Sequence, residues 1–224
     1  MSNLVKFAAL IPKDLLGHSG AVFYSGEAAF SRPSPVYLLG INPGGDPEGI
    51  TDQTVGSQIQ YVSLKMPHRW SAYRDEQWSS GDAGTHGMQP RVLHLCMQLG
   101  LDPRETPASN LMFTRSRREA ALLGDPKQLA EQCWPFHAAV IANLQVRLIV
   151  CFGQTVGRFV RRQFRAHNQT HEFYENNLRK WRSTVHSSKN GVCVATLTHP
   201  SIAAWTRPKT DPTLMVRDAL ANMG

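Results

Sequence analysis

Short apolar runs alternate with longer amphipathic stretches along this chain. Three of the runs are continuous, and each ends at a turn that contains glycine or proline: residues 36–41, 148–152 and 192–197. Runs of this kind are typical of strands that are buried on both faces of a parallel sheet. A further short strand is predicted around residues 111–113, after the break at Pro107.

Helical spacing separates the predicted strands. Apolar residues recur every three or four positions from residue 90 onward, where Pro90 suits a first helical turn and Gly100 suits a C-terminal cap. Further helices are predicted at residues 125–144, interrupted or kinked by Pro135, at residues 154–164, and after Asp211. This alternation predicts an α/β fold, a three-layer α/β/α arrangement around a central, mostly parallel sheet of four strands.

One domain accounts for the whole chain of residues 1–224. With 224 residues, of which 42% are hydrophobic, the chain can bury one substantial core. A long polar and aromatic insert at about residues 45–87 shows no clear periodicity, and we expect it to be functional or to hide a short helix. No apolar run reaches the roughly 18 residues of a membrane span, and no secretion signal is recognisable. We therefore expect a cytoplasmic monomer that contacts no membrane.

The charge balance favours a polyanionic partner. The formal net charge is +7, and a basic protein gains binding free energy when it neutralises the phosphates of a nucleic acid. The four cysteines, Cys96, Cys133, Cys151 and Cys193, are scattered without a CxxC pair. We interpret them as buried thiols rather than as ligands of zinc or of an iron–sulfur cluster.

Two polar loops follow the first and the last apolar run, and parallel sheets bind ligands at such carboxyl ends of strands. In the first loop, Asn42 beside Pro43 can hold a water molecule or a ligand, and a simple Asn-Pro turn is the alternative. In the last loop, His199 can donate a hydrogen bond to a carbonyl group or a developing anion; the alternative is a capping or turn histidine. The first loop lacks the full phosphate-binding pattern of a P-loop or a dinucleotide fold, so we expect no nucleotide cofactor.

The segment after His199 combines apolar and basic side chains. Ile202 and Trp205 lie close in sequence to Arg207 and Lys209. This composition is typical of a loop that wedges into a base stack and grips flanking phosphates. The alternative is a solvent-exposed loop with one packed tryptophan.

Gly40-Ile41-Asn42-Pro43-Gly44 and His199-Pro200-Ser201 together resemble the two motifs of the uracil-DNA glycosylase superfamily. The first has the GINPG form of the mismatch-specific uracil/thymine DNA glycosylases, and the second is shared by several branches. Ser109-Asn110-Leu111-Met112 is similar to the family segment that carries an asparagine between the motifs. The resemblance spans about residues 36–203 in the expected order.

This resemblance implies a monofunctional DNA glycosylase, which flips out a base and hydrolyses its N-glycosidic bond to leave an abasic site. Asn42 would position the water that attacks the sugar C1′, and His199 would stabilise the negative charge of the departing base. Asn110 would read the edge of the base, with Ile41 and Gly44 lining the pocket. No metal, nucleotide or redox cofactor is implied. The residues expected to contact DNA are Ser201, Ile202, Trp205, Arg207 and Lys209.

One family feature is missing from its usual place. Family members carry an aromatic residue, which stacks on the flipped base, about a dozen positions after the first catalytic residue, but residues 51–56 contain none. Four later aromatic residues are the candidates to replace it: Tyr61, Trp70, Tyr73 and Trp78. The alternative is that these four residues only pack the long segment. Together with the insert, this absence suggests a roomier pocket for a substrate bulkier than uracil, such as a modified cytosine of phage DNA, and hence a role in defence rather than repair.

Two other functions stay open from the sequence. The first is a catalytically weak relative of the same fold that binds DNA or an inhibitor without excision. The second is an unrelated α/β hydrolase or nucleotide-binding enzyme, although no GxSxG nucleophile motif occurs. Water is the simplest nucleophile for excision because no lysine occupies the first motif, and Lys65 is the nearest one in the insert.

A group of arginines marks the predicted helix at residues 154–164. Arg158, Arg161, Arg162 and Arg165 lie on or beside it. They are placed either to contact phosphates or to form a solvated helix face.

Overall fold

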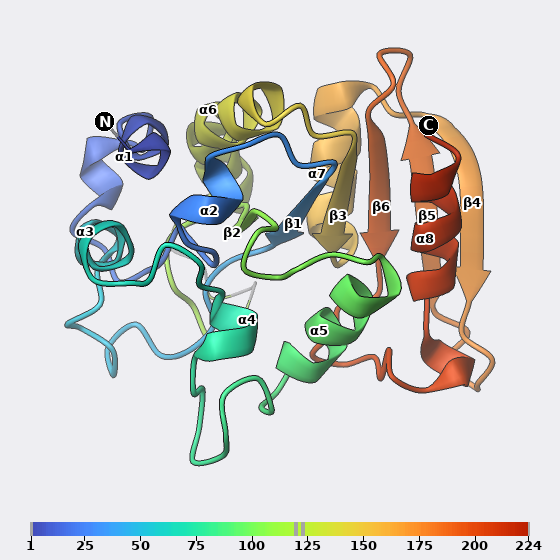
Figure 1. Ribbon diagram of the computed structural model, residues 1–224, viewed down its shortest axis with the longest axis horizontal. Coiled ribbons are helices and arrows are strands. Elements are labelled where there is room, and N and C mark those ends of the chain that lie inside the picture. Colours follow the sequence, from blue (N-terminus) through green and yellow to red (C-terminus); the bar gives the residue numbers. More distant parts are fainter. Residues whose placement is uncertain (1, 119–120, 122–123, 224) are drawn as a thin grey trace.

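The computed structural model describes residues 2–118, 121 and 124–223 and shows an α/β fold with a mixed, mostly parallel sheet (Figure 1). The sheet has six strands in the order β2-β1-β3-β6-β5-β4. The parallel strands are β1 (Val36–Gly40), β2 (Ala108–Asn110), β3 (Leu148–Phe152) and β6 (Cys193–Leu197). Two strands continue the sheet in antiparallel orientation, β5 (Arg182–Ser187) next to β6 and β4 (Asn168–Tyr174) at the edge. The expectation of four strands is therefore wrong, because it covers only the parallel part.

Helices precede, connect and follow the strands. They are α1 (Asn3–Ala8), α2 (Glu27–Phe30), α3 (Val55–Leu64), α4 (Ala72–Asp75), α5 (Gln89–Gln98), α6 (Pro126–Asn143), α7 (Gln154–Phe164) and α8 (Thr213–Ala221), with short 3₁₀ turns at Lys13–Leu15 and Pro208–Thr210. The four helices predicted from the sequence are confirmed as α5, α6, α7 and α8, and Pro135 does not interrupt α6. The insert hides two helices, α3 and α4.

Alternate residues of the central strands enter two different cores. Tyr37 and Leu39 of β1 pack with α6 and α7 on one face of the sheet, whereas Val36 and Leu38 pack with α5 and α8 on the other. Because side chains alternate across a strand, burial on both faces requires a continuous apolar run. This requirement explains why the sequence revealed β1, β3 and β6, and it makes their carboxyl ends a rigid platform.

All four cysteines are free and buried, as the sequence indicated. Burial raises the pKa of the Cys96 and Cys133 thiols to about 12. Within the described part of the chain, no helix is long and apolar enough to cross a lipid bilayer.

A buried histidine of α6, His137, links this helix to β1 and to the residue that follows β2. The Tyr37 hydroxyl lies 2.8 Å from Nδ1 of His137, and the histidine's Nε2 lies 3.1 Å from the Leu111 carbonyl oxygen. Because a carbonyl only accepts, Nε2 carries the proton and Nδ1 accepts from the tyrosine. Burial lowers the pKa of His137 to about 3.

Acidification is therefore expected to destabilise the protein. In the unfolded chain the His137 pKa returns to about 6.5, so below that pH the unfolded state binds a proton that the folded state excludes. The free energy of unfolding should fall by about 2 kcal/mol from this residue alone between pH 7 and pH 5. Urea denaturation at several pH values measures the effect. In the His137→Gln variant, which keeps one donor and one acceptor, most of this dependence should disappear; an unchanged dependence would contradict the role given to His137.

Candidate functional site

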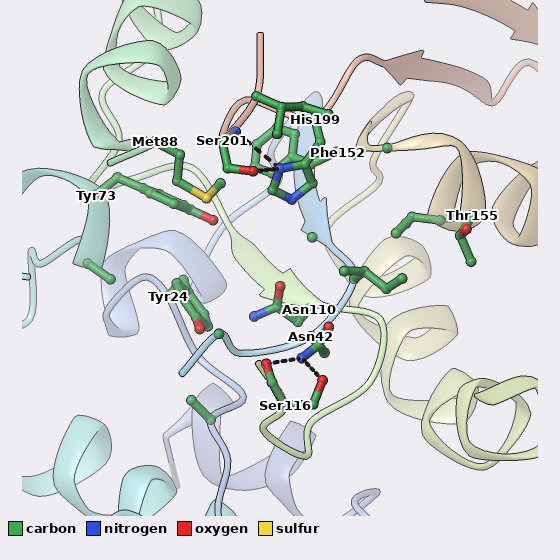
Figure 2. A pocket seen from close by; sticks show the side chains of 18 of the residues that line it. Tyr24, Asn42, Tyr73, Met88, Asn110, Ser116, Phe152, Thr155, His199 and Ser201 are labelled. Atoms are coloured by element: carbon green, nitrogen blue, oxygen red, sulfur yellow. Dashed lines mark hydrogen bonds between the residues drawn. The ribbon is translucent and has the colours of Figure 1, made fainter. Parts of the chain in front are cut away.

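A cleft of about 1510 Å³ opens along the carboxyl ends of the parallel strands. Asn42 follows β1, Asn110 ends β2 and His199 follows β6, and all three line this cleft (Figure 2). The strand order places β2 and β1 side by side, with only β3 between β1 and β6. Three residues that are far apart in the sequence therefore stand in one row along one edge of the sheet.

The strand between Asn42 and His199 ends at Gly153. Its φ of +106° is a conformation that glycine adopts at no steric cost, and a Cβ here would lie 3.7 Å from Cδ2 of His199. Neighbouring strands are about 4.8 Å apart, so roughly 10 Å separates the ends of β1 and β6. A side chain at Gly153 would therefore lie against the His199 ring, and the glycine leaves this part of the cleft lining uncovered.

Hydrogen bonds determine how Asn42 points. Its Nδ2 donates to the carbonyl oxygen of Pro43 at 2.8 Å, to the carbonyl oxygen of Ser116 at 3.3 Å and to Oγ of Ser116 at 3.0 Å. Since two of these partners are carbonyl groups, which only accept, this end of the carboxamide is its nitrogen. Figure 2 shows the side-chain oxygen of Asn42 turned away from Ser116. Sequence reasoning missed Ser116, because no local pattern relates it to Asn42.

His199 is held in one tautomer by the residue two positions later. The backbone N–H of Ser201 donates to Nδ1 of His199 at 3.1 Å, and Oγ of Ser201 lies 2.7 Å from the same nitrogen. Because Nδ1 accepts, the hydrogen of the neutral imidazole is on Nε2. Figure 2 shows this second nitrogen on the side of the ring that faces Asn110. The ring therefore presents a hydrogen-bond donor toward the cleft.

Two arginines brace the His199 loop. Arg91 of α5 donates to the Pro200 carbonyl oxygen at 2.8 Å, and Arg179 donates to the Ile202 carbonyl oxygen at 3.0 Å. Both bonds reach across long sequence separations, and neither was foreseen from the sequence. Together they hold two carbonyl groups of the loop in place.

Asn110 is buried in the floor of the cleft beside a glycine of the first motif. A Cβ at Gly40 would lie 2.1 Å from Oδ1 of Asn110, which is far inside van der Waals contact. Gly40 therefore leaves the room in which this carboxamide lies. A carboxamide offers one acceptor and two donor hydrogens, so it can match a base edge that presents both kinds of group.

Aromatic side chains form one wall of the cleft. Tyr73 stands at its centre, with ring centroids 5.8 Å from Tyr24 and 5.7 Å from Trp78. Of the four candidates for the stacking aromatic, Tyr73 and Trp78 line the cleft, whereas Tyr61 is exposed and Trp70 is buried elsewhere. Tyr24 was missed because it precedes the first motif.

Two ionisable groups of this wall keep their protons more tightly than usual. Burial raises the pKa of Tyr24 to about 12, with Arg115 opposing the shift, so the hydroxyl is neutral at physiological pH. Burial also raises the pKa of Glu76, whose Oε2 accepts a hydrogen bond from the Trp78 indole at 2.9 Å. The wall thus combines apolar ring faces with polar groups.

Neither a protein-family model nor a curated protein matches this chain. Among the residues that the structure describes, no three His, Cys, Asp or Glu side chains converge in a group that suits a metal ion.

Of the remaining residues that the sequence assigned to the site, some line the cleft and one is buried away from it. Ile41, Gly44, Ser201 and Ile202 line the cleft, and Ile202 is 56% exposed. The expectation that Trp205 contacts DNA is wrong. Its side chain is fully buried, its indole N–H donates to the Thr198 carbonyl oxygen at 3.2 Å, and its ring packs against Phe152. The tryptophan supports the His199 loop from below, which leaves Ile202 as the exposed apolar side chain of this loop.

Arg207 and Lys209 lie farther along the same segment. Both side chains are exposed, and neither belongs to the cleft lining. Their contact with DNA stays a prediction.

Proposed function

We propose that this protein is a monofunctional DNA N-glycosylase, which flips a base into the cleft and hydrolyses its N-glycosidic bond. One observation carries the proposal. The oriented carboxamide of Asn42 and the donor-bearing ring of His199 line the same cleft, on loops that follow strands two positions apart in the sheet. Such an arrangement suits a nucleotide whose sugar faces Asn42 and whose base faces His199. We propose a cytoplasmic monomer for this enzyme.

The role of Asn42 follows from its orientation. With Nδ2 occupied by Pro43 and Ser116, Oδ1 accepts a hydrogen bond from a water molecule and aims its lone pair at C1′ of the sugar. An amide is too weak a base to take the proton early, so positioning rather than proton transfer provides the rate enhancement. The water oxygen bonds to C1′ and loses its proton to solvent.

His199 acts on the leaving group. As the C1′–N bond breaks, its electron pair moves onto the base, and Nε2–H of His199 donates to a base oxygen where negative charge develops. A donor of this kind is typically worth about 3 kcal/mol of transition-state stabilisation. The tautomer that Ser201 imposes is the one this step needs.

The base itself would be held by Asn110 and the aromatic wall. Asn110 reads its hydrogen-bonding edge, and Tyr24 or Tyr73 offers a ring to pack against it. A pyrimidine fills only part of a cleft of 1510 Å³, and we assign the remaining space to the approach of the DNA. We keep two substrate classes, uracil and a bulkier modified cytosine of phage DNA, the second of which would make the protein a defence enzyme.

A panel of modified oligonucleotides tests this function. Single-stranded and duplex DNA carrying uracil, thymine mismatches or hypermodified cytosines is incubated with the protein, and alkali then cleaves the abasic sites. Strand breaks are expected with at least one of these bases, and breaks only with the bulky bases would identify the substrate class. DNA binding without breaks on any substrate would contradict excision and favour a non-catalytic relative of the same fold.

Replacing Ser116 with alanine is expected to slow excision about three- to tenfold, because the Asn42 amide loses one of its hydrogen bonds. The effect is moderate because the carbonyl groups of Pro43 and Ser116 still accept. Single-turnover kinetics at saturating protein measures it. Ser79→Ala in the exposed part of the insert is the matched control, and equal rates for both variants would remove Ser116 from the site.

A further inference from the structure

The positive charge of this chain is concentrated in one segment. Residues 154–190 contain eight lysines and arginines but only two acidic residues, which gives a formal +6 out of the +7 of the whole chain. The segment folds into α7, β4 and β5. It therefore contains the two strands that the sequence did not reveal.

Strand pairing orients these side chains. Arg182, Thr184 and His186 alternate along β5 and so share one face, and the pairing with β4 adds Glu172 and Gln169 to that face. All of these except Glu172 line the cleft, which therefore continues from His199 across β5. The opposite face of the two strands is covered by α8 (Figure 1). We call the cleft-lining side of these two strands, with Arg161 of α7, the β5 arm of the cleft; Arg182 is exposed there, whereas Thr184 and His186 are buried.

Arg161 crowds positive charge into this arm. Its guanidinium donates to a ring nitrogen of His186 at 3.1 Å and to the Gly157 carbonyl oxygen at 3.3 Å. Within the described residues, no carboxylate forms an ion pair with it. Burial lowers the pKa of Arg161, and the charges of Arg158 and Arg182 lower it further. An anion bound here would relieve that repulsion.

Arg182 has one acidic neighbour. Glu172 accepts a hydrogen bond from the Arg182 guanidinium at 2.8 Å, but both side chains are nearly half exposed. Exposed ion pairs of this kind contribute little to the stability of the fold. An incoming phosphate can compete for the guanidinium, because Arg binds phosphate oxygens with two parallel hydrogen bonds. Glu172 is then the acidic group that opposes such binding.

We propose that the β5 arm binds the phosphodiester backbone of the DNA strand that continues from the flipped nucleotide. Two observations favour DNA as the occupant. The arm carries positive charge, and it belongs to the same cleft as Asn42 and His199. The flipped nucleotide comes from the proposed function, whereas the attraction to a polyanion does not depend on it. Of the four arginines singled out in the sequence, only Arg161 lines the cleft, and Arg162 lies over the Phe159 ring instead.

The salt dependence of DNA binding tests this proposal. The affinity for an unmodified duplex is measured by fluorescence anisotropy from about 50 to about 300 mM salt. The slope of log K against log salt should fall by about one unit in Arg182→Gln and about two in the Arg161→Gln/Arg182→Gln double variant. At 0.1 M salt, affinity should fall about five- to tenfold per lost contact. Lysine at both positions should restore most of the slope.

The matched control lies on the other side of the same sheet. Arg217 of α8 is exposed, lies 3.8 Å from the carboxylate of Asp218, and is not part of the cleft lining. Arg217→Gln should keep the slope of the unaltered protein. An unchanged slope in Arg182→Gln, or an equal loss in Arg217→Gln, overturns the proposal.

Removing a negative charge from the arm should have the opposite effect on DNA affinity. Removing the acidic neighbour with Glu172→Gln should raise DNA affinity about two- to fivefold, since a phosphate no longer competes with a carboxylate. A decrease would contradict the proposed path of the backbone. Because these assays use unmodified DNA, they give a result even if no base is excised, and the absence of excision alone leaves the β5 arm unaffected.

Discussion

Excision should slow by about two to three orders of magnitude when Asn42 is replaced by alanine, because the water loses the group that aims it at C1′. Non-specific DNA binding should stay almost unchanged, since the side chain is only partly exposed and carries no charge. Single-turnover rates at saturating protein, with anisotropy on the same duplex, measure the two effects separately. Full activity of the alanine variant would show that Asn42 is not the residue that positions water.

Asn42→Asp is a more specific version of the same test. The nitrogen of the wild-type carboxamide faces two carbonyl oxygens, those of Pro43 and Ser116, and a carboxylate oxygen in its place would be repelled by both. The aspartate pKa should therefore rise, although a carboxylate is the stronger base. We expect an activity below that of the unaltered protein at neutral pH. A rate above it would mean that Asn42 can leave the orientation described here.

The second large effect is expected for His199→Ala, which removes the donor to the departing base. Loss of such a donor typically slows a reaction by about two to three orders of magnitude. The loss should appear in the rate at saturation rather than in DNA affinity. If the variant excises at the normal rate, the leaving group is stabilised by another residue.

Ser201→Ala is the matched control for His199. It removes the hydroxyl near Nδ1 but keeps the backbone N–H that donates to the same nitrogen. The tautomer is therefore retained, and we expect only about a two- to fivefold decrease in rate. A loss as large as that of His199→Ala would assign the serine hydroxyl a role of its own.

The parallel part of the fold was predictable because it is buried on both faces. Such strands need continuous apolar runs, and the turns at their ends identify the loops of Asn42 and His199. That these loops lie two strands apart, with Asn110 beside Asn42, required the strand order. The strand expected at residues 111–113, which are buried, begins three positions earlier, as β2, and pairs with β1 at Ala108–Asn110.

The antiparallel strands escaped prediction for a physical reason. β4 is an edge strand with mostly exposed side chains, so its sequence NQTHEFY has no apolar run and resembles a loop. β5 has polar residues on the face that lines the cleft. Strands that use one face for a polar site do not carry the pattern that reveals core strands.

Long-range contacts account for the other differences. Ser116 and Arg91 act on the first and last loops through bonds between residues far apart in the sequence, which no local pattern reveals. Trp205 was expected at the surface because it lies among basic residues, yet its neighbours in space are Phe152 and the Thr198 carbonyl. Composition indicates which residue types are present, but burial depends on the tertiary fold.

The uneven distribution of basic residues has a consequence before any contact forms. Residues 154–190 hold a formal +6 of the +7 charge, so the net positive charge is displaced toward the segment that contributes Arg161 and Arg182 to the cleft. In the field of a polyanion the protein would rotate during diffusion, so that productive encounters outnumber those of a uniformly charged sphere. Steering of this kind raises association rates by about ten- to a thousandfold and fades as salt screens it. The same orientation would persist while the protein slides along DNA, so the cleft would face the bases that it passes.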